Sequence, residues 1–314
     1  MREDNDRESR IANLEAGIAN DRATIRPQGR MARPLAYRVH STPTRDWRFA
    51  TSRLLKTYFR LSRAHRYSVL FALPLLIVYE SLAAMLNVRG VDVRNGADVI
   101  LKTPFVLLFG PRGQVVFGVV LVLGAVAVVW RDMRRPGSTL ERRVFGLMAA
   151  ESVVLALAFG LVVGVVTARL LHAIGMLGVA LPTDWPLLAV PPRSAARHGV
   201  EALAKPTQLM IGIGAGLYEE LLFRVIAVGS IQWVARSAFG WGPRAAGTLA
   251  VVAGALIFSA FHYVGALGDA FTVQSFAFRA IAGLFLSALY VLRGFGITAW
   301  THSLYDVFLM LFGI

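Results

Sequence analysis

Three short runs in the last third of the chain place acidic side chains, arginine and histidine within apolar sequence. The first run, GAGLYEELLFR, contains Glu219, Glu220 and Arg224. Residues four positions apart share a helical face, so Glu220 and Arg224 can form an ion pair that offsets part of the cost of burying both charges. Glu219 points about 100° away from Glu220 on a helix and is left for another task. The run therefore predicts one structural ion pair beside one working acid or base.

Two further runs place a histidine at the same spacing. FSAFHYVG contains Phe258 and His262, and WTHSLYDVF contains His302 and Asp306. In the second of these, the carboxylate can orient the imidazole, or both groups can face a metal ion or a water molecule. Each run alone is explained more simply by packing and hydrogen bonding. Together they bring Glu, Arg, His and Asp onto three apolar segments in the last third of the chain, where charged groups are costly, and this combination predicts a single site.

The composition indicates that these segments cross a membrane. Hydrophobic residues make up 56% of the 314 positions, and only 17% are charged. Soluble domains are typically about 45–50% apolar and about 25% charged. The mean hydropathy is +0.57, and the apolar residues lie in long runs rather than in alternating stripes. This pattern is typical of a polytopic membrane protein.

Several segments have the length of about 20 mostly apolar residues that a membrane-spanning helix needs. They are 67–87, 113–130, 144–172, 207–230, 245–264, 273–292 and 295–314. The run around 99–109 is shorter and contains Lys102 and Pro104, so we interpret it as interfacial or re-entrant. The fold prediction is an all-α transmembrane helix bundle of about seven spans over residues 67–314, with its catalytic core at about 207–310. Glycines at every second position before the acidic pair predict close helix packing there (Gly212, Gly214 and Gly216).

The N-terminal region is polar and basic. Residues 1–50 lack a sustained apolar period, which predicts a disordered cytoplasmic tail. Residues 51–66 (TSRLLKTYFRLSRAHR) predict a basic amphipathic helix on the membrane surface. The positive-inside rule then places the N-terminus in the cytoplasm and leaves 174–206 as a long external loop. Because arginine far outnumbers lysine, which we interpret as a bacterial genomic composition, we expect the location to be a bacterial cytoplasmic (inner) membrane.

The net charge of +14 does not indicate nucleic-acid binding. Many of the basic residues precede the first membrane segment, and no basic module with interleaved aromatic residues or zinc-ligand spacing accompanies them. We expect them to attract anionic lipid instead. The chain contains no cysteine, which excludes disulfides, thiolate metal sites and a cysteine nucleophile.

Taken in order, EExxxR, FxxxH and HxxxN/D on successive membrane segments resemble the CAAX protease and bacteriocin-processing (CPBP, or Abi) family of intramembrane proteases. The resemblance covers about residues 207–310 and rests on the order of the three motifs rather than on any one of them. It implies that Glu219 is the general base that activates the attacking water. It also implies that Glu220 and Arg224 support this base, and that His262 and His302 hold the water, a metal ion or the oxyanion.

The resemblance leaves two features of the mechanism open. Asp306 stands where the family often has asparagine, so it either donates a hydrogen bond or orients His302. The family is described both as metalloproteases and as metal-free glutamate proteases. The resemblance therefore implies either Zn²⁺ held by Glu219, His262 and His302, or no metal at all. Zn²⁺ would lower the pKa of the attacking water and polarise the carbonyl, and two histidines with one carboxylate are a suitable ligand set.

The favoured function is an intramembrane endopeptidase that acts on a membrane-embedded, membrane-anchored or lipidated protein or peptide. The HExxH, GxGD and rhomboid-like GxSG signatures of other membrane proteases are absent from the sequence. A transporter or proton-coupled carrier that uses Glu219, Glu220 and the same histidines as a relay is one alternative. It predicts inverted repeats and broken helices in both halves, whereas the polar groups cluster in the C-terminal third. A non-catalytic immunity or scaffold protein is the other, and the intact motifs argue against it.

Glu80, also at membrane depth, is interpreted as a hydrogen-bonded or interfacial carboxylate. The sequence leaves open which membrane face the site opens to.

Overall fold

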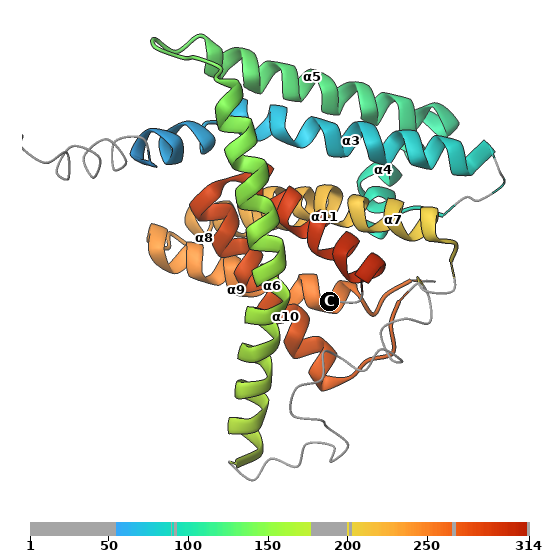
Figure 1. Cartoon of the computed structure of the whole chain (residues 1–314), viewed down its shortest axis with the longest axis vertical. Helices are drawn as coiled ribbons and strands as arrows, with labels where there is room; N and C mark the ends of the chain where they lie inside the picture. The colour runs from blue at the N-terminus through green and yellow to red at the C-terminus, as the bar shows by residue number, and fades with distance from the viewer. Residues whose placement is uncertain are drawn as a thin grey trace, which may run out of the picture. The chain divides into compact units, whose positions relative to one another are not determined.

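The computed structural model describes residues 55–88, 90, 93–176, 200, 203–265 and 268–312, and all regular structure within these ranges is helical (Figure 1). The prediction of an all-α helix bundle is confirmed. The predicted tail at 1–50 and most of the predicted external loop at 174–206 lie outside the described residues. Within the predicted surface helix at 51–66, residues 55–62 are helical and a turn at 63–64 separates them from the next helix.

The first half of the described chain forms four α-helices. They are α3 (His65–Val88), α4 (Gly96–Phe109), α5 (Gly113–Met133) and α6 (Arg142–Met176), with the short 3₁₀ helix η1 (Gly110–Arg112) between α4 and α5. The apolar run around 99–109 is thus a separate helix. It begins at the N-cap Asn95 and ends at Gly110, whose φ of 61° is readily available to glycine.

The second half begins with one uninterrupted helical stretch that changes its winding in the middle. It consists of α7 (Lys205–Gly214), the π-helical segments η2 (Ala215–Glu219) and η3 (Leu221–Val228), and α8 (Gly229–Ser237). Three α-helices follow: α9 (Pro243–Phe261), α10 (Val273–Arg293) and α11 (Phe295–Phe312). π-Helical turns are rare and occur frequently at functional sites, and here they contain or flank the acidic pair.

Five helical stretches among the described residues are long and apolar enough to cross a membrane: α3, α4 with α5, α6, α9 and α10. The predicted number of about seven spans also counts the α7–α8 stretch and α11. These two carry most of the charged groups identified in the sequence, including Glu219, Glu220 and Asp306. Polar groups of this kind lower the hydropathy of the helix that carries them.

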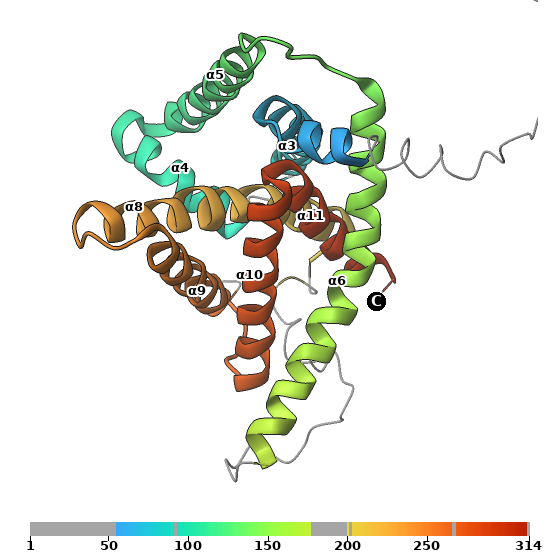
Figure 2. The same ribbon diagram turned by 90° about the vertical axis from the view of Figure 1, so that its left-hand side faces the viewer.

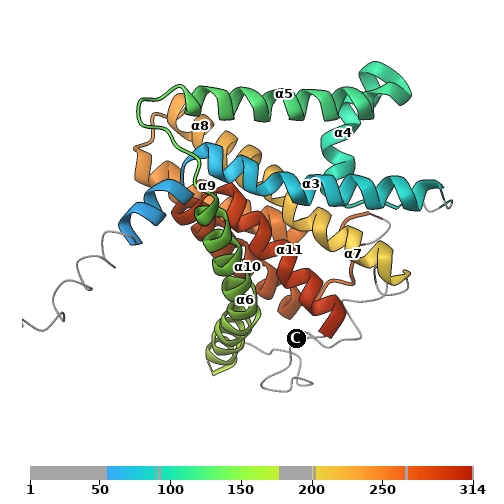
Figure 3. The same ribbon diagram turned by 45° about the horizontal axis from the view of Figure 1, so that its top comes forward.

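Helix α11 lies at the centre of the bundle, where it packs against α3, α6, α7, η2 and α10 (Figure 2). Two hydrogen bonds join it to α3: Trp300 Nε1 donates to the Phe71 carbonyl oxygen over 2.6 Å, and the Gly296 amide donates to Ser68 Oγ over 2.7 Å. On its other side α3 packs against α5, so that α3 lies between α5 and the layer of α7 and α11 (Figure 3).

Gly216 of η2 lies in close contact with α11. A Cβ atom added to Gly216 would lie 2.0 Å from Ser303 Oγ, 2.4 Å from the Ser303 backbone nitrogen and 2.5 Å from the Ala299 carbonyl oxygen. Only glycine fits here, and the predicted close packing at this position is confirmed. The helices that carry Glu219 and His302 therefore meet backbone to backbone, a few residues from both side chains.

We expect Gly216→Ala to lower the free energy of unfolding by at least about 1–3 kcal/mol, because the added methyl group meets the backbone of α11. The measurement is the thermal unfolding midpoint of the purified protein in detergent. Gly164→Ala in α6 is the matched control, since no atom lies within 4 Å of an added Cβ there. The control should leave the midpoint unchanged or raise it, because alanine favours helix over glycine. An unchanged midpoint in Gly216→Ala would contradict the close helix contact.

Candidate active site

The two adjacent glutamates are both buried but have different partners. Glu220 is 0% exposed and Glu219 is 6% exposed. The expected ion pair is present, because Arg224 Nε lies 3.1 Å from Glu220 Oε2. The other oxygen of Glu220 lies 2.7 Å from His302 Nδ1. Glu220 thus joins an arginine of its own helix to a histidine of α11.

Arg224 has a second contact that explains the phenylalanine of the FxxxH run. Its guanidinium carbon lies 4.3 Å from the centre of the Phe258 ring, and the side chain is only 1% exposed. Stacking of a guanidinium on an aromatic face is favourable, and more so when water is excluded. Phe258 therefore covers the buried ion pair from the side of α9.

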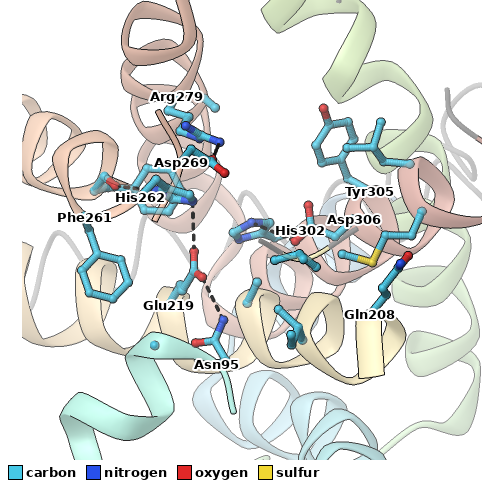
Figure 4. Close-up of a pocket in the computed structure, with 18 of the residues that line it drawn as sticks. Asn95, Gln208, Glu219, Phe261, His262, Asp269, Arg279, His302, Tyr305 and Asp306 are labelled. Atoms are coloured by element: carbon cyan, nitrogen blue, oxygen red, sulfur yellow. Dashed lines mark hydrogen bonds and ion pairs between the residues drawn. The ribbon is translucent and has the colours of Figure 1, made fainter. Parts of the chain in front are cut away.

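Glu219 points into a different environment, shown in Figure 4. Its Oε1 accepts a hydrogen bond of 3.0 Å from Asn95 Nδ2. Its Oε2 lies 3.8 Å from His262 Nε2 and makes no hydrogen bond to any described residue. His262 Nδ1 lies 2.8 Å from the Phe258 carbonyl oxygen, which can only accept, so Nδ1 carries the proton. In the neutral imidazole, Nε2 then presents its lone pair toward Glu219.

His302 is oriented by Glu220 rather than by Asp306. The Glu220 carboxylate accepts from the Nδ1–H of His302, whereas Asp306 Oδ2 lies 3.6 Å from Nε2, beyond hydrogen-bond distance. One of the two roles considered for Asp306 was to orient the His302 ring. In the structure Glu220 performs this role. Asp306 instead adds a negative charge next to the second nitrogen of the ring.

Asn95 was missed by the sequence analysis. Its Oδ1 accepts from the Ala97 amide over 2.8 Å, as expected of an N-cap, and this bond directs Nδ2 toward Glu219. The backbone amide of Asn95 donates to Tyr79 Oη over 3.3 Å, and Tyr79 donates in turn to Asp98 over 2.9 Å. An asparagine before a helical run signals a cap in sequence, but nothing signals a contact with a residue 124 positions away.

A cavity of about 940 Å³ brings most of these groups to one surface. Glu219, His262, His302 and Asp306 line it together with Asn95, whereas Glu220 and Arg224 lie behind its wall. The remaining wall is largely apolar and includes Phe159, Phe258, Phe261, Phe278 and Leu286. The six residues singled out in the sequence therefore divide into four that face the cavity and two that support them.

A second charged pair lies beside His262 and was also not identified as part of a site. Arg279 of α10 forms an ion pair with Asp269, donates to Ser275 Oγ over 2.7 Å and lies 5.3 Å from the centre of the Tyr263 ring. Both charged residues line the cavity, as Figure 4 shows. The Asp269 side chain is only 12% exposed and forms its ion pair with Arg279, whose side chain is 15% exposed.

The side chains that face the cavity include ligand types that Zn²⁺ prefers, namely two imidazoles and a carboxylate. Both histidines also have one ring nitrogen bound to an oxygen (the Phe258 carbonyl for His262, Glu220 for His302), which is the usual outer shell of a metal-bound histidine. Within the described ranges, however, no three His, Asp or Glu side chains are arranged as a metal site. The donor types fit Zn²⁺ but are not gathered around one point, and the zinc and metal-free alternatives both stay predictions.

Residues 203–308 match the family model described as Type II CAAX prenyl endopeptidase Rce1-like. The matched stretch contains all six residues singled out in the sequence, and the resemblance to the CAAX protease family is confirmed. The match supports an intramembrane endopeptidase at the level of the family, and with the apolar helices it supports a multi-pass membrane protein. Searches of curated proteins and of solved structures find no match. Asn95 lies outside the matched residues.

The ion pair between Glu220 and Arg224 makes a prediction about stability. Removing one partner leaves the other charge buried, so we expect Arg224→Met to lower the free energy of unfolding by about 3–5 kcal/mol. Adding Glu220→Gln removes that charge and retains a carbonyl oxygen that accepts from His302. The double variant should therefore be more stable than Arg224→Met, as measured by thermal unfolding in detergent. A double variant less stable than the single variant would show that the two side chains do not compensate each other.

Proposed function

We propose that the protein is an intramembrane endopeptidase that hydrolyses a peptide bond in a membrane-anchored or lipidated protein, with Glu219 as the general base. The observation that carries this proposal is the environment of the Glu219 carboxylate. One oxygen is held by Asn95, while the other has no hydrogen bond among the described residues and belongs to a side chain that lines the cavity. A buried carboxylate of this kind is ready to accept a proton from a water molecule.

The reaction uses the two sides of the site differently. Glu219 takes a proton from the attacking water as the water oxygen bonds to the scissile carbonyl carbon. The same carboxyl then returns the proton to the amide nitrogen as the carbon–nitrogen bond breaks. His302, whose Nδ1 is held by Glu220, offers Nε2 in its protonated form as a donor to the oxyanion. His262 Nε2, 3.8 Å from Glu219, borders the space from which the water is activated.

The walls of the cavity are suited to a polypeptide from a membrane environment. Ligand pockets typically measure about 300–1,000 Å³, and this cavity of about 940 Å³ is at the upper end of that range. Its aromatic and aliphatic lining accepts apolar side chains or a lipid chain, and Glu219, His262 and His302 supply polar groups for the reaction. In the metal-dependent version of the proposal, Zn²⁺ held by Glu219, His262 and His302 would polarise the scissile carbonyl.

The transporter alternative would use Glu219, Glu220 and the two histidines as a proton relay, and a relay across the membrane would need further polar groups from the N-terminal half. Glu80 is bound by Lys102 Nζ over 2.8 Å and by Tyr218 Oη over 2.6 Å, and Lys102 also lies 2.7 Å from Asp98. Arg94 completes the cluster, because it lies 3.4 Å from Glu80 and 3.3 Å from Asp98. Arg94 lines the cavity, whereas Glu80, Asp98 and Lys102 do not. Their mutual pairing favours a structural role for this cluster over a proton relay.

We expect Glu219→Gln to abolish peptide-bond cleavage. The purified protein is incubated in detergent with a membrane proteome from its own host, and new peptide termini are identified by mass spectrometry. Termini produced by the unaltered protein should disappear with Glu219→Gln, because an amide cannot accept the proton from water. Glu80→Gln, which changes a carboxylate outside the cavity, is the control that should retain them. Zinc content measured on the same samples decides between the two versions of the mechanism.

Unchanged cleavage by the Glu219→Gln variant would contradict the protease proposal. If Glu219→Gln remains folded and yields the same termini as the unaltered protein, the protease proposal is wrong. The carrier alternative would then be tested by proton-coupled uptake in reconstituted vesicles.

The contact between Asn95 and Glu219 predicts a change in the pH dependence of cleavage. Asn95→Asp keeps the cap of α4 but replaces the donor to Glu219 with a second carboxylate oxygen. Because like charges disfavour ionisation, we expect cleavage at pH 7 to fall about tenfold and to recover at higher pH. Asn95→Ser keeps a capping oxygen and loses only the hydrogen bond to Glu219, so it should shift the profile in the same direction but less than Asn95→Asp. A rate that falls equally at every pH would indicate a purely structural effect and contradict this role for Asn95.

A further inference from the structure

One end of the helix bundle carries most of the described arginines. The connection between α5 and α6 contributes one group of them (Arg131, Arg134, Arg135, Arg142 and Arg143). Helix 55–62, the start of α3, the α8–α9 turn and the end of α10 contribute the others (Arg60, Arg63, Arg66, Arg236, Arg244 and Arg293). In Figure 1 the start of α3, the α5–α6 connection and the α8–α9 turn lie on the same side of the view.

Ion pairs and a hydrogen bond join these chain segments, apart from the α8–α9 turn, which Figure 1 places on the same side. Arg66 at the start of α3 lies 2.9 Å from Asp132 at the end of α5. Arg293 at the end of α10 lies 2.6 Å from Glu151 of α6, and it donates to Ser62 of the 55–62 helix over 2.9 Å. Together these segments form the basic end of the bundle.

The basic end also has the aromatic residues of a membrane–water interface. Trp130, Trp233 and Trp241 lie at or near its turns and are 56%, 69% and 45% exposed. Tryptophan gathers at the headgroup level of membranes, and arginine-rich short connections stay in the cytoplasm. The basic end is therefore expected to face the cytoplasm, in agreement with the orientation predicted from the sequence.

The cavity has no wall residue from the basic end among the described residues. Its wall comes from the middle of the helices and from chain segments at their opposite ends. These are residues 94–96 before α4, 203–205 at the start of α7, Val264 and 268–269 after α9, and 309–312 at the end of α11. The cavity thus leads from the catalytic groups away from the basic end.

We infer that the catalytic cavity opens on the extracytoplasmic side of the membrane, and that the substrate is a polypeptide cut at the outer end of its membrane anchor. The substrate part of this inference rests on the proposed function. Apolar wall residues accept the anchor, and the exposed wall residue Val264 marks the outer end of the cavity, where the chain emerges into water. A substrate whose scissile bond lies on the cytoplasmic surface would meet the closed end of the bundle.

The absence of cysteine makes the direction of opening directly measurable, since every introduced thiol is the only one in the chain. Val264→Cys marks the mouth of the cavity, where the side chain is 71% exposed. Thr139→Cys marks an exposed position of the α5–α6 connection at the basic end. Each variant is labelled with a membrane-impermeant maleimide in right-side-out and in inverted vesicles, and labelling of the denatured protein gives the total.

We expect Val264→Cys to be labelled in right-side-out vesicles and Thr139→Cys in inverted vesicles, each at least tenfold more than in the opposite orientation. The reverse pattern, labelling of both positions from one side, or no labelling of Val264→Cys before denaturation would overturn the inference. Modification of Val264→Cys should also reduce cleavage at least tenfold, whereas modification of Thr139→Cys should not change it. This result would connect the labelled opening to the catalytic site.

Failure of the inference is distinguishable from failure of the proposed function, because labelling does not depend on hydrolysis. If labelling follows the expected pattern but no Glu219-dependent termini form, the direction of opening holds and the protease assignment does not. If such termini form but map to the cytoplasmic flank of membrane segments, the protease assignment holds and the inferred substrate class is wrong.

Discussion

The arrangement of the site depends on a single fully buried carboxylate, that of Glu220. It neutralises Arg224 on its own helix and holds His302 on α11, so that three groups which are costly to bury in isolation satisfy one another. This contact also sets which nitrogen of His302 remains for chemistry. The neighbouring Glu219 is thereby left as the acidic side chain of this pair that faces the cavity, and the division of labour between the two glutamates follows from their adjacency.

The close packing of η2 against α11 makes this arrangement possible. Gly216 brings the two helices into backbone contact one turn from the acidic pair, which allows the short side chain of Glu220 to reach His302 directly. The N-terminal half then completes the site from the other side. Helix α4 packs against η2, and its capping residue Asn95 holds the Glu219 carboxylate. The N-terminal cap of α4 and the glycine contact between η2 and α11 therefore determine where Glu219 points.

How much of this the sequence could predict depends on how local each contact is. The pair of Glu220 and Arg224 follows from a spacing of one helical turn, and the sequence alone predicted it. The convergence of the three motifs was predicted from the cost of charges in a membrane and from the family resemblance. The contact of Asn95 with Glu219 joins residues far apart in sequence, and no periodicity encodes it. The orientation of His302 was ambiguous for the same reason, since the nearby Asp306 and the distant Glu220 are both carboxylates.

The position of Asn95 has a consequence for how the protein can be divided. The stretch that matches the family model begins at residue 203, yet the amide that holds Glu219 lies more than a hundred residues earlier. The catalytic region is consequently not a self-contained module. Transplanting residues 203–308 into another membrane scaffold would carry over every motif residue but leave Glu219 without its amide partner. Among chimeras, those that inherit α3 and α4 together with the C-terminal region would retain the geometry of the site.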